Sequence, residues 1–285
     1  MALENRYDFV MLFDVENGNP NGDPDAGNSP RVDPETQYGY ITDVCVKRKI
    51  RNYVELLKEG EAGYNILIKP DRSLNAKFTA AYESEGLTTG QKGKNQDDVK
   101  KARDFMCKNY FDVRAFGAVM STGDDPCGIV RGPVQINFAR SISPVSIEDI
   151  SITRQARTTD ERTETGNTEM GRKSIIPYAL YRAEGYVSAA LANKVTGLSE
   201  DDIELLWQAI INMFENDHSA ARGKMCMRRL YVFRHDSVLG NAPSHVLFDK
   251  ISVCPKREPP RAFSDYTVDV DKREMPEGVT LIEKL

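Results

Sequence analysis

The chain has 285 residues, of which 40% are hydrophobic, and a formal net charge of −5. This length can bury a sizeable core, and because no apolar run approaches the roughly 18 residues that cross a bilayer, we expect no membrane span. The opening MALENRYD lacks the basic and then apolar order of a signal peptide, so we expect a cytoplasmic protein. The five cysteines are widely spaced and form no C-x-x-C pair, which argues against a zinc site or a disulfide framework.

Positive charge is segregated along the chain, although the net charge alone argues against a nucleic-acid partner. Residues 47–51 read KRKIR, and residues 218–235 contain lysines and arginines but no acidic residue. Acidic residues collect in SEDDIE at 199–204 and in the tail from Asp265 to Glu277. Local basic stripes on an acidic body can bind a polyanion while the remainder keeps the protein soluble.

The chain begins with a strand and a long loop. Residues 6–15 are rich in Tyr, Phe, Val and Leu and precede a cluster of Asn, Gly and Pro, which predicts a strand followed by a loop to about residue 41. Residues 42–60 are the clearest helix, with Thr42 as N-cap and apolar residues at helical spacing. Lys47, Arg48 and Arg51 fall off its apolar stripe and project to one flank.

The middle of the chain is predicted to contain a helix and two strands. Residues 60–100 are polar and loop-rich, and residues 98–110 form the helix. FDVRAFGAVM at 111–120 and GPVQINFARSI at 132–142 read as strands, which we expect to pair as a hairpin. In the second strand Val134, Ile136 and Phe138 alternate with period two, as in a half-buried strand.

The second half of the chain opens with a polar segment. Residues 152–177 form a segment of different character, in which the positions from Thr153 to Ser174 contain almost no large apolar residue except Met170, and a polar excursion of this length inside a domain is usually disordered or functional. A helix over 198–214 is indicated by Ser199 as cap and Asp202 at a capping-box position. Further strands are predicted at 177–191, 226–236, 245–254 and 266–270. This order predicts one α+β domain with a ferredoxin-like or RRM-like antiparallel sheet.

The stretch NGNPNGDPD at 17–25 allows several interpretations. As a calcium loop it fails, because Asn28 occupies the position that requires a bidentate Glu. Four carboxylates in and beside this stretch could form a magnesium cluster. The Asn, Gly and Asp residues also suit a turn in which side chains form hydrogen bonds with their own backbone. In a third interpretation, backbone N–H groups and the amides of Asn19 and Asn21 lie against a sugar-phosphate chain. The four carboxylates belong to Asp14, Glu16, Asp23 and Asp25.

Enzymatic motifs are scarce in this sequence. His218 and the His235–Asp236 pair occur in the same order as the metal ligands of a metal phosphohydrolase. Because the segment around His235 has strand composition, we instead expect histidines that lie on the surface or have hydrogen-bond partners within the fold. The chain has no G-x-S-x-G motif, no Walker loop and no dinucleotide fingerprint. We therefore expect neither a cofactor nor a bound metal.

Basic residues occur together with amides, aromatics or methionines in several segments. That mixture suits single-stranded RNA, where cations follow the phosphates and flat or apolar side chains meet unstacked bases. The aromatic signature of an RRM is missing. The segments concerned contain Lys47, Lys49 and Arg51; Arg114; Gln135; Arg154 and Arg157; and Arg222 with Lys224.

Five segments together resemble one family. NPNGDPD, GYITDVCVKRKIRNY, DVRAFGAV, RGPVQINFARS and the late SAARGKM look like the backbone subunit of the type I-C CRISPR Cascade complex, the seventh Cas family of the repeat-associated mysterious protein superfamily. The resemblance runs over nearly the whole chain. It implies a right-hand shape with a palm at about 1–59, 101–151 and 176–285, a fingers insertion at about 60–100 and a thumb hairpin at about 152–175.

The resemblance also implies partners. Copies of such subunits stack head to tail along one CRISPR RNA, whose bases pair with target DNA, and the complex adds large, small and guide-end-capping subunits. RNA contacts are expected to be independent of sequence. They are carried onto Asn19, Asn21, Lys47, Lys49, Arg51, Arg114, Gln135, Arg154, Arg157, Met170, Arg172, Arg222 and Lys224.

Several alternatives stay open. Met170 is a candidate wedge between bases or a residue that packs at the hairpin base, and ion pairing within the fold is the competing role for each arginine. We expect a protein that is not an enzyme. The rivals are a metal-dependent ribonuclease that uses a loop aspartate, an endoribonuclease that processes precursor CRISPR RNA, and a self-assembling protein with no ligand. The aspartate would be Asp14, Asp23, Asp25 or Asp33.

Overall fold

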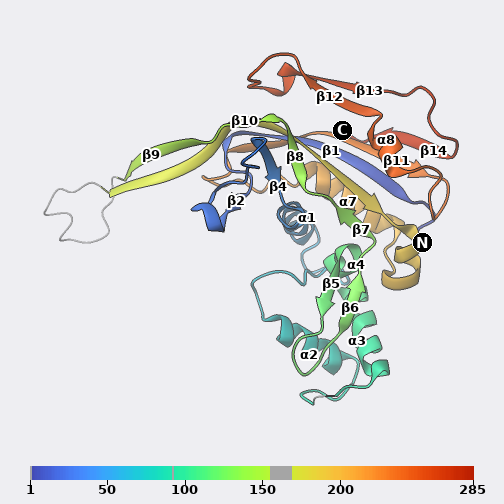
Figure 1. The fold of residues 1–285 in the computed structure, drawn as a ribbon. Coiled ribbons are helices and arrows are strands. Elements are labelled where there is room, and N and C mark those ends of the chain that lie inside the picture. Colours follow the sequence, from blue (N-terminus) through green and yellow to red (C-terminus); the bar gives the residue numbers. More distant parts are fainter. Residues whose placement is uncertain (1, 92, 155–168) are drawn as a thin grey trace, which may run out of the picture.

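An eight-stranded sheet forms the centre of the computed structural model, which describes residues 2–91, 93–154 and 169–285 (Figure 1). The strand order is β14-β11-β1-β10-β8-β4, with β7 and β9 also paired to β10, and every pairing is antiparallel. The predicted mixed α/β chain with a large antiparallel sheet is confirmed. The strands are β1 (Tyr7–Gly18), β4 (Tyr38–Ile41), β7 (Val134–Ile136), β8 (Ala139–Pro144), β9 (Glu148–Arg154), β10 (Glu169–Val187), β11 (Lys224–His235) and β14 (Val279–Glu283).

Strand β1 is buried on both faces, which explains its continuous apolar run. Phe9 and Phe13 pack with the helix layer, and the ring of Phe9 lies 5.2 Å from that of Trp207. Val10 and Leu12 point to the opposite face, where they meet a second cluster. That face is covered by α8 (Ser244–Phe248) and by a two-stranded ribbon of β12 (Ile251–Pro255) and β13 (Tyr266–Val270).

Two predicted helices lie on the first face. Helix α1 (Asp43–Leu57) starts where the Thr42 side chain accepts a hydrogen bond from the Cys45 amide at 3.3 Å. Helix α7 (Glu200–Asn212) starts with a capping box of Ser199 and Asp202. Both helices and both caps are confirmed, because their signals are local and need no distant partner.

A separate lobe lies below the sheet in the view of Figure 1. Its core contains Phe78, Tyr82, Met106 and Met120, a cluster distinct from those beside the sheet. The lobe continues to Arg131, beyond the predicted boundary at residue 100. Its elements are α2 (Leu74–Ser84), which was not predicted, α3 (Gln96–Asn109), α4 (Phe111–Phe116), β5 (Gly117–Met120) and β6 (Gly128–Arg131).

The strand predicted at 111–120 is wrong in its first part. Residues Phe111–Phe116 form helix α4, and all six are buried. Because no side of this helix meets water, its sequence shows no helical period and reads like a buried strand. The predicted hairpin with 132–142 is also wrong: β5 pairs with β6, whereas β7 and β8 both pair with β10.

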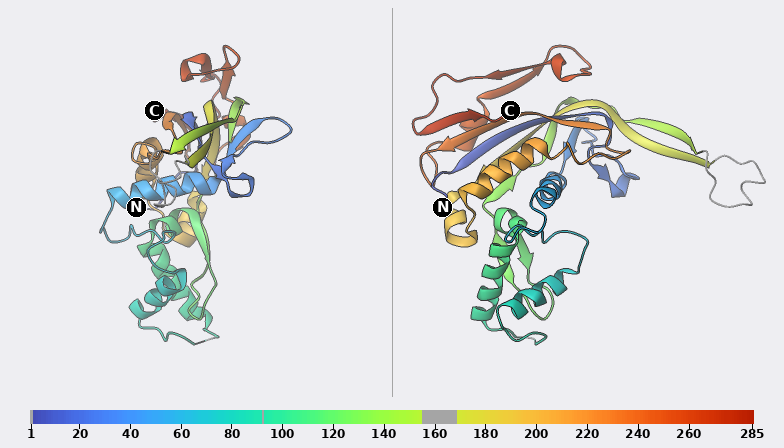
Figure 2. Two further views of the ribbon diagram at one scale, coloured as in Figure 1. Left: turned by 90° about the vertical axis from the view of Figure 1, so that its left-hand side faces the viewer. Right: turned by 180° about the vertical axis from the view of Figure 1, so that it is seen from behind.

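Strands β9 and β10 extend from the sheet as a projecting hairpin (Figures 1 and 2). Its described pairs run from Glu148–Ile175 to Arg154–Glu169. The described helices include none long and apolar enough to cross a membrane. The remaining elements are short: β2 (Gly22–Asp23), η1 (Pro24–Ala26), β3 (Ser29–Pro30), α6 (Ala189–Leu191), η2 (Ala192–Thr196) and η3 (Phe263–Asp265).

Candidate nucleic-acid interface

The asparagines of the NGNPNGDPD loop fold the loop itself. The Asn19 side-chain amide donates to the Asn28 carbonyl at 2.7 Å, and Asn21 Oδ1 accepts from both the backbone amide and the hydroxyl of Thr42 at 3.0 Å. Asn21 therefore fixes the start of α1. The interpretation of this stretch as a turn is confirmed, whereas the amide nitrogen of Asn19 and the carbonyl oxygen of Asn21 are already engaged within the fold.

The basic residues of α1 make different contacts from those that were predicted for them. Arg51 Nε lies 2.8 Å from Asp112 Oδ2 with its side chain 10% exposed, and Lys49 is buried against Asp217. Lys47 pairs with Asp43 at 2.9 Å. Lys49 and Arg51 are corrected from RNA contacts to internal ion-pair partners, because a buried cation needs a partner inside the protein.

Arg48 is the exposed cation that the prediction left out of the site. It lies on the outer side of α1, and the described part of the chain places no carboxylate within 4.0 Å of its guanidinium. The sequence did contain a signal for the exposure of Arg48, because this residue lies off the apolar stripe of the helix. The burial of Lys49 and Arg51 leaves Arg48 as the exposed positive group of KRKIR.

A shared carboxylate holds two of the predicted contacts together. Asp217 contacts the Lys49 ammonium and the Arg222 guanidinium, with Nη1 of Arg222 at 3.1 Å from Oδ1. Two positive groups and one negative group leave a net positive charge at this point. Arg222 keeps 31% of its side chain exposed, so it can still face a ligand.

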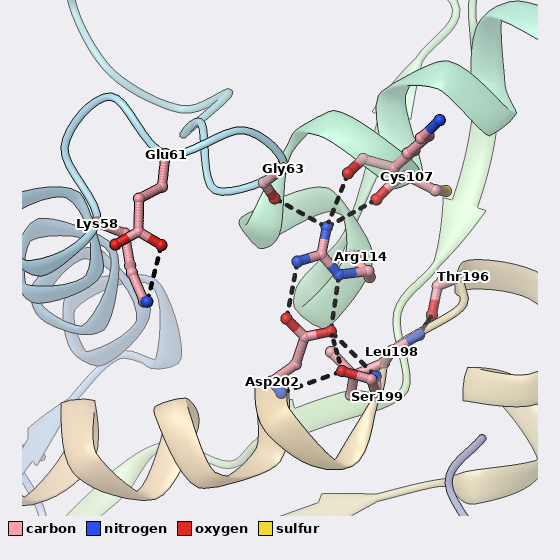
Figure 3. A network of polar contacts seen from close by, with 10 residues as sticks. Lys58, Glu61, Gly63, Cys107, Arg114, Thr196, Leu198, Ser199 and Asp202 are labelled. Carbon is pink, nitrogen blue, oxygen red and sulfur yellow. Dashed lines mark hydrogen bonds and ion pairs between the residues drawn. The ribbon is translucent and has the colours of Figure 1, made fainter. Parts of the chain in front are cut away.

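Arg114 has a structural role that Figure 3 shows in full. Its Nε and Nη2 atoms meet the two carboxylate oxygens of Asp202 at 2.9 and 2.8 Å. Its Nη1 atom donates to the carbonyls of Gly63, Cys107 and Lys108. All its donor atoms are engaged and its side chain is 9% exposed, so Arg114 is corrected from an RNA contact to a buried link.

Three segments meet where the hairpin leaves the sheet. They are the loop around Asn19 and Asn28, the β10 residues Arg172–Ile175, and Ala221 before β11; together they line a hollow of about 180 Å³, which we call the loop–hairpin notch. The Asn19 backbone amide donates to the Ala221 carbonyl at 2.8 Å, and Lys173 Nζ donates to the Ala220 carbonyl at 2.8 Å. Strand β10 thus places two consecutive cations at the rim, with Arg172 exposed.

The remaining predicted contacts are dispersed. Gln135 is exposed on β7 and donates to the Gly132 carbonyl at 3.1 Å. Lys224 is 64% exposed and lies 3.5 Å from Glu16. Arg154 and Met170 occupy neighbouring pairs near the described end of the hairpin, Arg154–Glu169 and Thr153–Met170. Arg157 lies outside the described residues.

Two of the candidate nuclease aspartates, Asp14 and Asp33, accept hydrogen bonds within the fold. Asp14 accepts hydrogen bonds from the Tyr178 hydroxyl at 2.9 Å and from Arg228 Nε at 2.8 Å, and burial raises its pKa although both partners lower it. Hydrogen bonds from the Glu35 amide and from Thr36 lower the pKa of Asp33. Among the described residues, no group of three or more His, Cys, Asp or Glu side chains could hold a metal.

The histidines match their prediction. His218 is exposed. His235 is fully buried, with Nε2 at 3.1 Å from Asp8 Oδ2 and with Nδ1 accepting from the Asn241 amide at 2.8 Å. Because Nδ1 accepts, the proton of the neutral ring lies on Nε2 and points at the carboxylate. His235 is therefore a satisfied core histidine.

Comparisons with known proteins agree on one family. The family model described as "CRISPR-associated protein Cas7" matches residues 5–271. A curated protein of Haloferax volcanii, also named "CRISPR-associated protein Cas7", is 27% identical over 253 residues, which cover 81% of this chain and 71% of that protein.

Solved structures give weaker likenesses. A chain of "CRISPR RNA-guided surveillance complex, pre-nicking" matches with a TM-score of 0.49 and 12% sequence identity. The match covers 80% of this chain and 78% of that chain. A chain of "Cryo-EM structure of the Type III-B Cmr-beta bound to cognate target RNA" has a TM-score of 0.43 at 13% identity, over 80% of this chain and 61% of its own. Since the family model spans nearly the whole sequence, the chain belongs to the Cas7 family of CRISPR-associated proteins.

Proposed function

We propose that the chain is the backbone subunit of a type I-C Cascade complex, a non-catalytic protein that binds CRISPR RNA without reading its sequence. Several copies lie head to tail along one guide, whose bases pair with target DNA, and the large, small and guide-end-capping subunits complete the cytoplasmic assembly. The observation that carries this proposal is the Cas7 family match over residues 5–271.

The architecture supports a palm, fingers and thumb. Elements β1, α1, β8, β10, α7 and β11 follow one another as β-α-β-β-α-β, and their strands lie in the order β11-β1-β10-β8, as in ferredoxin-like and RRM-like sheets. The projecting β9–β10 hairpin suits a thumb, and the separate lobe suits fingers. The loop–hairpin notch lies at the base of this thumb.

The distribution of charge supports head-to-tail stacking on a polyanion. The first turn of α7 is acidic, whereas the loop–hairpin notch and the Asp217 cluster carry excess positive charge. Surfaces of opposite sign on one molecule favour a heterologous contact between copies. Exposed cations along the path of the RNA backbone bind phosphates whatever the sequence of the bases.

Binding of single-stranded RNA as a function of salt tests the proposal. Replacing Arg48 and Arg172 together by Ala should weaken binding and reduce the steepness of log K against log salt by about 0.7 for each phosphate that the variant no longer neutralises. Fluorescence anisotropy with oligouridine and oligoadenosine measures both quantities, and the two RNAs should bind alike.

A matched control separates direct contact from total charge. The double replacement of Arg131 and Arg257, two exposed arginines outside the notch, removes the same charge and should leave the salt dependence unchanged. Equal slopes for the two double variants would contradict the assignment of Arg48 and Arg172. Absence of RNA binding by the unchanged protein at low salt would contradict the proposed function itself.

The same protein should not cleave RNA. Incubating bound or paired strands with magnesium should leave them intact, since Asp14 is held by Tyr178 and Arg228, and Asp23 accepts from the Asp25 amide and pairs with Arg31 at 3.3 Å. Cleavage at regular intervals that disappears in Asp33→Ala would refute the non-catalytic assignment. Gel analysis of end-labelled RNA provides the measurement.

A further inference from the structure

The side-chain oxygen of Asn19 has no hydrogen-bond partner. Asn19 is only 8% exposed, and its Oδ1 atom is shielded from water and accepts no hydrogen bond within the part of the chain that the structure describes. The nitrogen of the same amide donates to the Asn28 carbonyl at 2.7 Å, and this bond assigns the other atom as the oxygen. A buried acceptor without a donor costs free energy, so this oxygen points to a donor that comes from outside the chain.

A close crossing of two backbone segments holds this acceptor at the loop–hairpin notch. A Cβ atom on Gly18 would lie 1.8 Å from the Arg222 carbonyl oxygen, so only glycine allows the two segments to approach this closely. The crossing brings the Asn19 amide to the Ala221 carbonyl at 2.8 Å. Asn19 and Ala221 both line the notch. The position of the acceptor is therefore fixed by the backbone.

The rim of the notch is positively charged. Arg172 and Lys173 of β10 line it, and Arg222 follows the lining residue Ala221 with 31% of its side chain exposed. Arg172 is exposed, so its side chain can turn outward and admit a ligand to the shielded oxygen. The hollow of about 180 Å³ has room for one sugar ring.

Two acidic side chains near the rim are engaged within the fold. Asp149 accepts a hydrogen bond from the hydroxyl of the lining residue Ser174, and Asp217 pairs with Lys49 and Arg222. Neither carboxylate lines the notch. Because the cations outnumber these acids, the rim attracts an anion and disfavours a cationic donor such as a lysine of a second copy. The missing donor must therefore be a neutral group on an anionic ligand.

We infer that the notch binds one ribose of the bound RNA, with Asn19 Oδ1 accepting a hydrogen bond from the 2′-hydroxyl and the rim cations contacting the adjacent phosphate. This inference rests on the proposed function and deepens it, because it names the group by which the protein distinguishes RNA from DNA. A ribose carries a neutral donor beside a phosphate, whereas deoxyribose keeps the phosphate and lacks the donor. The contact does not involve the base, so it is compatible with binding that is independent of sequence.

RNA in which fluorine replaces the 2′-hydroxyl tests the inference, because fluorine keeps an RNA-like sugar but cannot donate a hydrogen bond. In fluorescence anisotropy, oligouridine should bind the unchanged protein about five- to tenfold more tightly than its 2′-fluoro and 2′-deoxy counterparts, as expected for one lost hydrogen bond. Single 2′-fluoro replacements along the RNA should locate one sensitive ribose per bound subunit. RNA and 2′-fluoro RNA should show the same salt dependence, since they carry the same phosphates.

Asn19→Ala should remove this preference, so that RNA binds the variant as weakly as 2′-fluoro RNA binds the unchanged protein. Asn137→Ala is the matched control, because Asn137 lies outside the notch between β7 and β8 and its Nδ2 also makes one hydrogen bond, to the Tyr186 hydroxyl. It should keep the preference for RNA. If Asn19→Ala fails to fold, the single replacements tested on the unchanged protein decide the matter.

The possible results separate this inference from the function on which it depends. If the unchanged protein binds RNA and 2′-fluoro RNA equally well, the ribose site is refuted while the proposed function stands. If Asn19→Ala keeps the preference, another group contacts the hydroxyl and the inference is wrong. If Asn19→Ala instead abolishes self-association without RNA in sedimentation velocity, the acceptor binds a second copy and the inference is again refuted. If the unchanged protein binds no RNA, the proposed function fails first.

Discussion

Replacing Arg114 by Ala is expected to lower the free energy of unfolding by about 3–5 kcal/mol, because it leaves the buried Asp202 carboxylate without its cation. It also frees the carbonyls of Cys107 and Lys108 in the last turn of α3, which a cation normally stabilises. Arg114→Lys should recover only part of the stability, since an ammonium cannot form the two parallel bonds to a carboxylate.

Urea unfolding followed by circular dichroism measures this effect. Arg103→Ala provides the matched control, because Arg103 lies on α3 with 34% of its side chain exposed and only a loose contact of 3.7 Å to Asp104. It should leave the unfolding midpoint unchanged. If Arg114→Ala kept full stability but reduced the salt dependence of RNA binding, Arg114 would be an RNA contact after all.

Helix α1 shows how much of the site could be predicted from sequence. Its limits and its cap were predictable because Thr42 and the spacing of Val46, Ile50 and Val54 are local signals. The roles of its cations were not, because the partner of Lys49 lies 168 residues away and that of Arg51 lies 61 residues away. A basic run looks the same in sequence whether its charges face solvent or distant carboxylates.

The strands show a different limit. The antiparallel sheet follows from β-rich segments separated by turn residues, but the direction in which Phe138 points depends on its register with β10. A single extra residue reverses every later side chain, and nothing in GPVQINFARSI marks where it occurs. The exposure of Phe138 could therefore be found only in the structure.

Helix α4 connects the lobe to the helix layer through two residues on one short element. Arg114 reaches Asp202 on α7, and Asp112 reaches Arg51 on α1. Asp112 also accepts hydrogen bonds from the amides of Leu67 and Ile68 at 2.8 and 3.1 Å. The segment from Gly63 to Ile68 is thus held from both sides by α4.

Replacing Asp112 by Ala is therefore expected to destabilise the fold by about 3–5 kcal/mol, since a guanidinium and two amides lose their acceptor in a site that is 1% exposed. Asp112→Asn should cost less, because its amide oxygen still accepts. Glu61→Ala, which removes the exposed partner of Lys58, should leave urea unfolding unchanged.

The double variant Asp112→Ala with Arg114→Ala tests whether α4 couples the lobe to the sheet through both of these residues together. Each single change releases the segment from Gly63 to Ile68 on one side, so the second change has less left to disrupt. The combined destabilisation should fall short of the sum of the two single effects by roughly 1 kcal/mol or more. Strict additivity in the double-mutant cycle would mean that the two ion pairs stabilise α1 and α7 independently and that α4 does not couple the lobe to the sheet.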